Sequence, residues 1–166
     1  MEENRKEIDE LKLGNELMLR RYLFNKTQVS RVLNEADYIV LNIIKDTGSE
    51  QEIYEGKTYL KDLSEKVMLT IRQTSKLIGK LKERGLVKWS HDGDGNEGTY
   101  VTITDEGRKL LEQQQAVNKE YYGNVIRQFG KDNLIELLNL MKQLETVMYS
   151  EQEKMEVDRD VNGRAE

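Results

Sequence analysis

Several side chains suited to binding nucleic acid share one predicted helix, residues 70–84. They are Arg72, Gln73, Ser75, Lys76 and Lys80. Arginine and glutamine can form two-pronged hydrogen bonds to guanine and adenine edges, whereas lysine and hydroxyl groups bind phosphates. Apolar residues recur in the same segment at helical spacing, at Leu77, Ile78 and Leu81, with Thr74 one turn earlier. The pattern predicts one face packed inward and a polar face turned outward.

Signals in the sequence define both ends of this helix. Thr70 and Gln73 form the capping-box pattern, in which each side chain satisfies a backbone amide at the helix start. Gly85 supplies the stop, because glycine adopts a left-handed C-terminal conformation without steric cost. Gly79 lies on the polar face, although glycine costs about 1 kcal/mol in a helix interior. We interpret it as a place where the backbone approaches another surface closely.

Positive charge is concentrated around this helix. Residues 57–88 contain nine basic and three acidic residues, a net charge of +6 in a chain whose net charge is −5. A basic segment on an acidic background indicates nucleic-acid binding, and a solvated polar face without a partner is the alternative. We assign Thr70, Lys61 and Lys80 to the DNA backbone, and Arg72, Gln73, Ser75 and Lys76 to base edges or nearby phosphates.

The composition excludes several classes of site. The 166 residues include no cysteine and one histidine, so disulfides, thiolate metal sites and Cys–His nucleophile pairs cannot form. No glycine-rich phosphate motif is present, and we expect no enzyme, no cofactor and no bound metal. No apolar run reaches the roughly 20 residues that span a bilayer, and the first residues lack the layout of a secretory signal. We expect a soluble, cytoplasmic protein without a membrane partner.

The whole chain predicts a mainly α fold with a small β-hairpin wing. Helices are expected at 1–26, 35–44, 60–69, 70–84, 105–129 and 132 to about 150, and strands at 86–91 and 99–103. Asn34 offers an N-cap for the second helix, and Leu69 is expected to be buried at the turn before residue 70. Residues 45–49 should end the second helix, and residues 50–58 read as a loop or a brief strand.

Two regions flank a winged helix-turn-helix at residues 35–104. Residues 1–34 form an N-terminal helix and linker, residues 105–150 form C-terminal helices, and residues 151–166 form a loose polar tail, all within one structural domain. The first and last helices carry apolar bands that the compact helix-turn-helix does not cover. A second copy of the chain would cover them, so we interpret these elements as dimerisation helices. A two-fold dimer places its recognition helices in successive major grooves, about 34 Å apart.

Three segments resemble the MarR family of bacterial transcription regulators. They are residues 33–44, residues 63–87 with the turn Leu81-Lys82-Glu83-Arg84-Gly85-Leu86-Val87, and Thr102-Ile103-Thr104-Asp105-Glu106-Gly107. The resemblance covers most of the chain and implies a homodimer built from the first, fifth and sixth helices, with a recognition helix at 70–84. It also implies a cleft that binds small aromatic or phenolic effectors. Tyr22, Tyr38, Tyr121 and Tyr122 lie on helices that would line this cleft, and packing in the core or at the dimer interface is the alternative for each.

The loop between the two strands departs from the family pattern. Family wings carry arginine near the tip, whereas the loop at residues 92–98 carries three acids, which phosphate would repel. They are Asp92, Asp94 and Glu97. Asp92, Asp94 and Asn96 are also spaced like the start of a calcium loop, but Glu97 and Ile103 stand where that motif requires glycine and glutamate. We therefore interpret the loop as a flexible turn whose contact with DNA is in doubt.

These observations predict a DNA-binding transcriptional regulator, a repressor that binds a pseudo-palindromic operator as a homodimer and is released by a small-molecule effector. A winged-helix adaptor that binds protein, with little or no DNA binding, is the alternative suggested by the acidic wing. The two hypotheses differ in whether duplex DNA is bound with a steep salt dependence.

Overall fold

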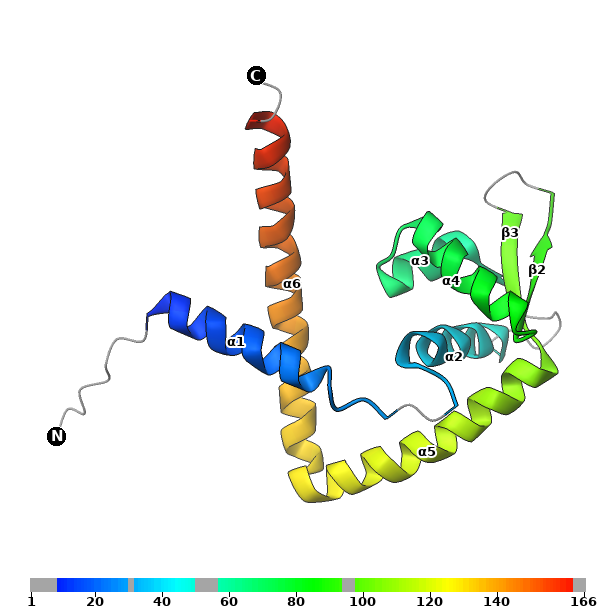
Figure 1. The fold of residues 1–166 in the computed structure, drawn as a ribbon, viewed down its shortest axis with the longest axis horizontal. Coiled ribbons are helices and arrows are strands. Elements are labelled where there is room, and N and C mark those ends of the chain that lie inside the picture. The colour runs from blue at the N-terminus through cyan, green and yellow to red at the C-terminus, as the bar shows by residue number, and fades with distance from the viewer. Residues whose placement is uncertain (1–8, 30–31, 50–56, 94–97, 163–166) are drawn as a thin grey trace. The chain divides into compact units, whose positions relative to one another are not determined.

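The structure, a computed structural model, describes residues 9–29, 32–49, 57–93 and 98–162 (Figure 1). In chain order the elements are α1 (Glu10–Phe24), α2 (Glu35–Ser49), β1 (Thr58–Tyr59), α3 (Leu60–Val67), α4 (Ile71–Glu83), β2 (Val87–His91), β3 (Thr99–Ile103), α5 (Asp105–Phe129) and α6 (Lys131–Asn162). The chain forms two compact units, residues 1–118 and 119–166, with the boundary inside α5. The mainly α fold with a small β-sheet is confirmed.

The core of the first unit lies where α2, α3, α4 and the sheet meet. Its buried apolar residues are Leu33, Val40, Leu41, Ile44, Leu60, Leu63, Ile78, Leu81, Leu86, Val87, Val101 and Leu111. Both helices of the helix-turn-helix contribute their apolar stripes, as their 3.6-residue spacing predicts. Leu69 is an exception, because 36% of it remains exposed at the turn between α3 and α4, where burial is expected from the sequence.

The wing is a β-hairpin with a short third strand added to it. β2 pairs antiparallel with β3 from Val87 opposite Ile103 to His91 opposite Thr99, and β1 pairs with the other edge of β3. The sequence predicts a loop or a brief strand at residues 50–58, and β1 begins at Thr58. Residues 50–56 lie outside the described residues.

The start of α5 is joined closely to the base of the wing. A Cβ at Gly107 would collide with the carbonyl oxygen of Leu86, so only glycine permits this approach. The hydroxyl of Thr104 donates to the carbonyl of Gly85 at 2.6 Å and accepts from the N–H of Gly107 at 3.0 Å. Thr104 thus caps α5, as its sequence position predicts, and links this cap to Gly85 just after the end of α4.

Several helix ends differ from the sequence-based expectations. α1 begins at Glu10 and ends at Phe24, whereas residues 1–8 of the expected helix lie outside the described residues. α2 continues to Ser49 instead of ending before it, and within this extension the Thr47 hydroxyl bonds to the carbonyl of Ile43. The corrections are two residues at the end of α1 and five at the end of α2, because local polarity is a weak guide to where a helix ends.

The loose tail expected from Ser150 is wrong for the described residues, because α6 continues to Asn162. This stretch contains neither proline nor glycine before residue 163, so nothing in it interrupts a helix. Pairs spaced by three or four residues support the extension, including Lys154 with Glu151 at 2.6 Å and Gln152 with Glu156 at 3.2 Å. Residues 151–157 are all exposed, including the apolar Met155 and Val157.

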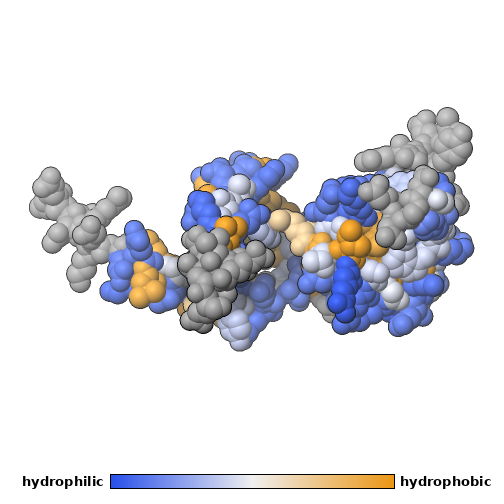
Figure 2. All heavy atoms as spheres, turned by 90° about the horizontal axis from the view of Figure 1, so that it is seen from above, coloured by the Kyte–Doolittle hydropathy of each residue, from blue (hydrophilic) through white to orange (hydrophobic). Residues whose placement is uncertain are grey.

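The second unit contains the end of α5 and the whole of α6. Gly130 separates the two helices with a φ of 99°, a conformation that favours glycine, at the break expected from the sequence. Large apolar residues are exposed along α6, and space-filling atoms show apolar residues at the surface among hydrophilic ones (Figure 2). None of the described helices combines the length and the apolar composition needed to cross a membrane.

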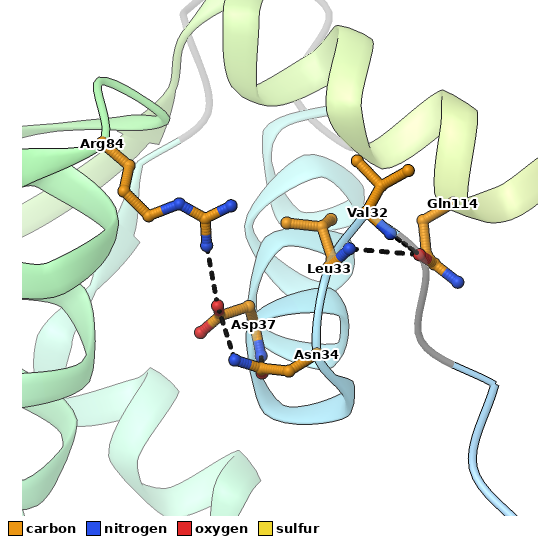
Figure 3. A network of polar contacts seen from close by, with 6 residues as sticks. All are labelled: Val32, Leu33, Asn34, Asp37, Arg84 and Gln114. Carbon is orange, nitrogen blue, oxygen red and sulfur yellow. Dashed lines mark hydrogen bonds and ion pairs between the residues drawn. The ribbon is translucent and has the colours of Figure 1, made fainter.

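A buried glutamine attaches the chain before α2 to α5 (Figure 3). Gln114 is 1% exposed, and its Oε1 accepts hydrogen bonds from the backbone N–H groups of Val32 and Leu33, both at 3.1 Å. Its Nε2 donates to the carbonyl of Val29 at 3.3 Å and to Asn118 Oδ1 at 3.0 Å. One side chain therefore satisfies three backbone groups that no secondary structure satisfies, and it holds α2 in place beside α5.

Replacing Gln114 with methionine should destabilise the protein. The substitution keeps the length of the side chain but leaves two backbone N–H groups without their acceptor, which should lower the free energy of unfolding by about 2 to 3 kcal/mol. Urea denaturation measures the change. The matched control is Gln113→Met at the exposed neighbouring position, which should change stability by less than about 0.5 kcal/mol. Equal stability of the two variants would contradict the role of Gln114.

Candidate nucleic-acid interface

The start of α4 is fixed by the capping box expected from the sequence. The Thr70 hydroxyl oxygen accepts from the N–H of Gln73 at 3.1 Å, and Gln73 Oε1 accepts from the N–H of Thr70 at 3.0 Å. The acceptor oxygen of Gln73 is therefore engaged at the helix start. A two-pronged contact to adenine needs both the acceptor and the donor of this amide. Because the acceptor is bonded to Thr70, Gln73 caps the helix in this structure and is not free to make that contact.

The outer face of α4 presents unpaired positive charges. The side chains of Arg72, Lys76 and Lys80 are exposed, and none of them forms an ion pair with any residue that the structure describes. Thr74, Ile78 and Leu81 occupy the opposite face and are buried, which confirms the amphipathic pattern. Uncompensated cations on one side of a rigid helix form a surface suited to phosphates.

Two small residues, Ser75 and Gly79, lie between these cations on α4. Ser75 and Gly79 are half-buried on α4. A Cβ at Gly79 would meet no atom within 4 Å, so packing against the described chain does not require glycine there. The interpretation that Gly79 allows close approach to another molecule is compatible with this open space.

The side chain of Arg84 forms an ion pair within the chain (Figure 3). Its Nη1 lies 3.0 Å from Asp37 Oδ2, and the same oxygen accepts from Asn34 Nδ2 at 2.9 Å. Asn34 Oδ1 accepts from the N–H of Asp37 at 2.8 Å, which confirms Asn34 as the cap of α2. Asp37 is 6% exposed, and a buried carboxylate needs such partners. The pair joins the C-terminal end of α4 to the start of α2.

The ion pair between Arg84 and Asp37 is not predicted from the sequence above, although the sequence contains one signal for it. Asp37 lies in a helix with apolar residues on nearly every side, where an acid must find a cation or a donor. The charge count over residues 57–88 treats Arg84 as part of the basic surface, whereas the structure places it against α2. Lys61 and Thr70, assigned to the DNA backbone, are exposed on α3 and at the start of α4.

The acidic residue at the start of the wing loop is bonded to the sheet. Asp92 Oδ2 accepts from the Tyr59 hydroxyl at 2.7 Å, and the N–H of Asp92 donates to the carbonyl of Gly98 at 3.0 Å. Tyr59 packs edge-to-face against Tyr100, with 6.0 Å between ring centroids, and Lys57 Nζ lies 4.7 Å from the Tyr100 ring. The Asp92 carboxylate is thus held at the loop end of the hairpin by Tyr59 of β1.

The calcium-loop alternative falls mostly outside the described residues, since Asp94 and Asn96 belong to residues 94–97. Within the part of the chain that is described, no group of three or more His, Cys, Asp or Glu side chains could hold a metal ion.

The four tyrosines expected at an effector cleft belong to different units. Tyr22 on α1 is exposed, with Lys26 Nζ 4.5 Å from its ring, and Tyr38 on α2 is half-buried against the core. Tyr121 and Tyr122 lie in the second unit and pack edge-to-face at 5.1 Å between centroids. A shared site for the four stays a prediction. A separate cavity of about 450 Å³ lies between the end of α2, β1 and α3, and none of these tyrosines lines it.

Comparison with known proteins relates this geometry to solved structures. No protein-family model matches the sequence, and no curated protein matches it. The structure is similar to that of the PcaV transcriptional regulator from Streptomyces coelicolor in complex with its natural ligand, with a TM-score of 0.63 and 18% sequence identity over 88% of this chain and 98% of that one.

Two further solved structures are similar to this chain over nearly their whole length. NMB1585, a MarR family regulator from Neisseria meningitidis, has a TM-score of 0.62 and 20% identity over 89% of this chain and 99% of its own. A mutant MarR from E. coli, complexed with operator DNA, has a TM-score of 0.65 and 16% identity over 82% of this chain and 99% of its own. These neighbours are transcriptional regulators. The chain therefore has the winged-helix fold of the MarR-family regulators.

Proposed function

We propose that this protein is a MarR-type transcriptional regulator, a repressor that binds a pseudo-palindromic DNA operator as a homodimer. The observation that carries the proposal is the outer face of α4, where Arg72, Lys76 and Lys80 are exposed and unpaired with described residues. The inner face of the same helix is held in the core by Thr74, Ile78 and Leu81. A rigid helix with a cationic outer face is the element that a major groove accepts.

The apolar surfaces of α1 and α6 support a dimer. Large apolar residues are exposed on both helices, including Leu19 and Leu23 on α1 and Leu138 and Leu144 on α6. Large apolar side chains exposed along a helix indicate a site of interaction with another molecule. A second copy of the chain covers such surfaces symmetrically and supplies the second recognition helix that a palindromic operator requires.

A small aromatic or phenolic effector completes the proposal. One structurally similar regulator was solved with its natural ligand, and another was solved with operator DNA. Tyr22, Tyr38, Tyr121 and Tyr122 are the candidate residues for the effector, because their rings can stack on an aromatic compound and their hydroxyls can orient it. We propose no catalytic activity, no cofactor and no metal requirement.

A protein-binding adaptor is the second candidate, and the acidic wing favours it. The Asp92 carboxylate accepts a hydrogen bond from the Tyr59 hydroxyl at the loop end of the hairpin, so at least this acid has a fixed position in the wing. Phosphate would be repelled there. Fluorescence anisotropy with a mixed-sequence duplex separates the candidates, because DNA binding predicts a steep loss of affinity as salt rises, whereas an adaptor shows negligible binding even at low salt.

Replacing Arg72 with alanine should weaken binding to the operator. DNA fragments bound by the full chain are first selected from the source genome. On the best of them, loss of Arg72 should cost about 1 to 3 kcal/mol of binding free energy and relax the base preference at one position of each half-site. Anisotropy titration measures the affinity. An unchanged affinity would remove Arg72 from the interface.

Lys80→Met and Arg84→Met form a matched pair, because each removes one positive charge from the same end of the recognition helix. Lys80→Met should leave stability unchanged and reduce the slope of log affinity against log salt by about one.

Arg84→Met should leave that slope unchanged and lower the free energy of unfolding by about 1 to 3 kcal/mol. It removes the charged partner of buried Asp37, although the partial exposure of Arg84 limits the loss. Urea denaturation and salt titrations of DNA affinity measure both quantities. The assignment of the two charges is wrong if the variants behave alike.

A lysine at Leu144 should disrupt the dimer. Leu144 is exposed in the apolar stripe of α6, and a charge buried between two copies of the chain would be strongly unfavourable. Light scattering coupled to size exclusion should show a dimer for the unmodified protein and a monomer for Leu144→Lys. Gln143→Lys adds the same charge at the neighbouring exposed position and should remain dimeric. A monomeric unmodified protein would contradict the proposed assembly.

A further inference from the structure

An apolar cluster is exposed at the start of the recognition helix. It consists of Met68, Leu69 and Ile71, which are 62%, 36% and 54% exposed. Met68 adopts a left-handed conformation, with φ 53° and ψ 42°, at the end of α3, and Ile71 is the first residue of α4. The cluster therefore occupies the tight turn of the helix-turn-helix, directly before Arg72.

The fold itself does not need these side chains at the surface. The inward contacts of α4 come from Thr74, Ile78 and Leu81, and none of the three cluster residues belongs to the buried core. Solvent exposure of three large apolar residues in a turn is unfavourable, and a neighbouring molecule that covers them would offset this.

The capping box limits which side chains at the start of α4 can read bases. Thr70 and Gln73 are hydrogen-bonded to each other's backbone, whereas Ile71 and Arg72 project between them without such bonds. In a helix-turn-helix, the first residues of the second helix contact base edges in the major groove. On α4, the residues available for such contacts are Ile71 and Arg72.

We propose that Ile71 is a specificity residue that packs against the 5-methyl group of thymine in the major groove. The inference rests on the proposed DNA-binding function and deepens it. The thymine methyl is the apolar feature that a base pair presents in this groove, and cytosine lacks it. The charges of Arg72, Lys76 and Lys80 select a polyanionic partner for this end of the helix, so a nucleic acid suits the cluster better than an uncharged surface.

Deoxyuridine substitution tests this contact because it removes only the methyl group. The full chain is titrated against the selected DNA fragment, in which each thymine is replaced in turn by deoxyuridine. At one thymine of each half-site, the loss of the methyl should weaken binding by the unmodified protein about four-fold, the value expected for burial of one methyl group. Substitutions at thymines outside the contact should have no effect.

The decisive measurement is a double-substitution cycle with Ile71→Ala. This variant should bind the unmodified DNA more weakly than the parent protein and should lose no further affinity when that thymine becomes deoxyuridine. Ile39→Ala is the matched control, since Ile39 is an exposed isoleucine on α2, and it should keep the full sensitivity to deoxyuridine. Circular dichroism verifies that both variants are folded, and Ile71→Val, which keeps most of the apolar surface, should retain part of the sensitivity.

Two results would overturn the inference in distinguishable ways. In the first, the protein binds DNA with the expected salt dependence, but Ile71→Ala and deoxyuridine have additive effects at every thymine. This would contradict only the methyl contact and would leave the cluster as a surface for another protein. Absence of salt-dependent binding to any fragment by the unmodified protein would sink the proposed function, and the methyl contact with it.

Discussion

The arrangement of the helix-turn-helix depends on satisfying one buried carboxylate. Asp37 lies at the start of α2, and its Oδ2 accepts from both Arg84 and Asn34. A buried carboxylate is costly unless it is paired, so Arg84 at the end of α4 and the Asn34 cap of α2 itself are both held close to it. This constraint fixes the C-terminal end of α4 against α2. The N-terminal end of α4, with its capping box, is left at the surface with Arg72. Gln114 of α5 likewise satisfies buried polar groups, the backbone N–H groups of Val32 and Leu33, and so joins the chain before α2 to α5.

Local features of the fold could be predicted from the sequence because their causes are local. The capping box of Thr70 and Gln73, the left-handed Gly85, the hairpin and the break at Gly130 each depend on residues a few positions apart. The polar contacts that hold the helices together could not be predicted in this way. Arg84 and Asp37 are 47 residues apart, and Gln114 bonds to residues 81 and 82 positions away. Sequence shows that a buried acid needs a partner, but only the fold shows which cation is near.

In the candidate interface, too, the sequence does not determine which partner a single side chain binds. Counting charges places Arg72 and Arg84 in one basic surface, yet Arg72 has no ion-pair partner among the described residues and Arg84 is bonded to Asp37. Gln73 is equally suited by type to a base edge and to a helix cap, and its Oε1 serves the cap. Leu69, assigned by type to the core, is partly exposed. Residue type defines what a side chain can do, whereas the position of its neighbours decides which of these things it does.

The acidic wing and the apolar turn together bear on how DNA would be recognised. Affinity that arises from phosphate contacts is insensitive to sequence and falls with salt, whereas contacts in the groove distinguish bases. A wing in which Asp92 is fixed by Tyr59 would repel DNA phosphates, so in the proposed complex α4 would supply a larger share of the binding free energy. Its first residues are an exposed isoleucine and an unpaired arginine, which can contact a methyl group and a guanine edge. If the chain binds DNA as proposed, weak binding to arbitrary sequence would then contribute to specificity as much as strong binding to the operator would.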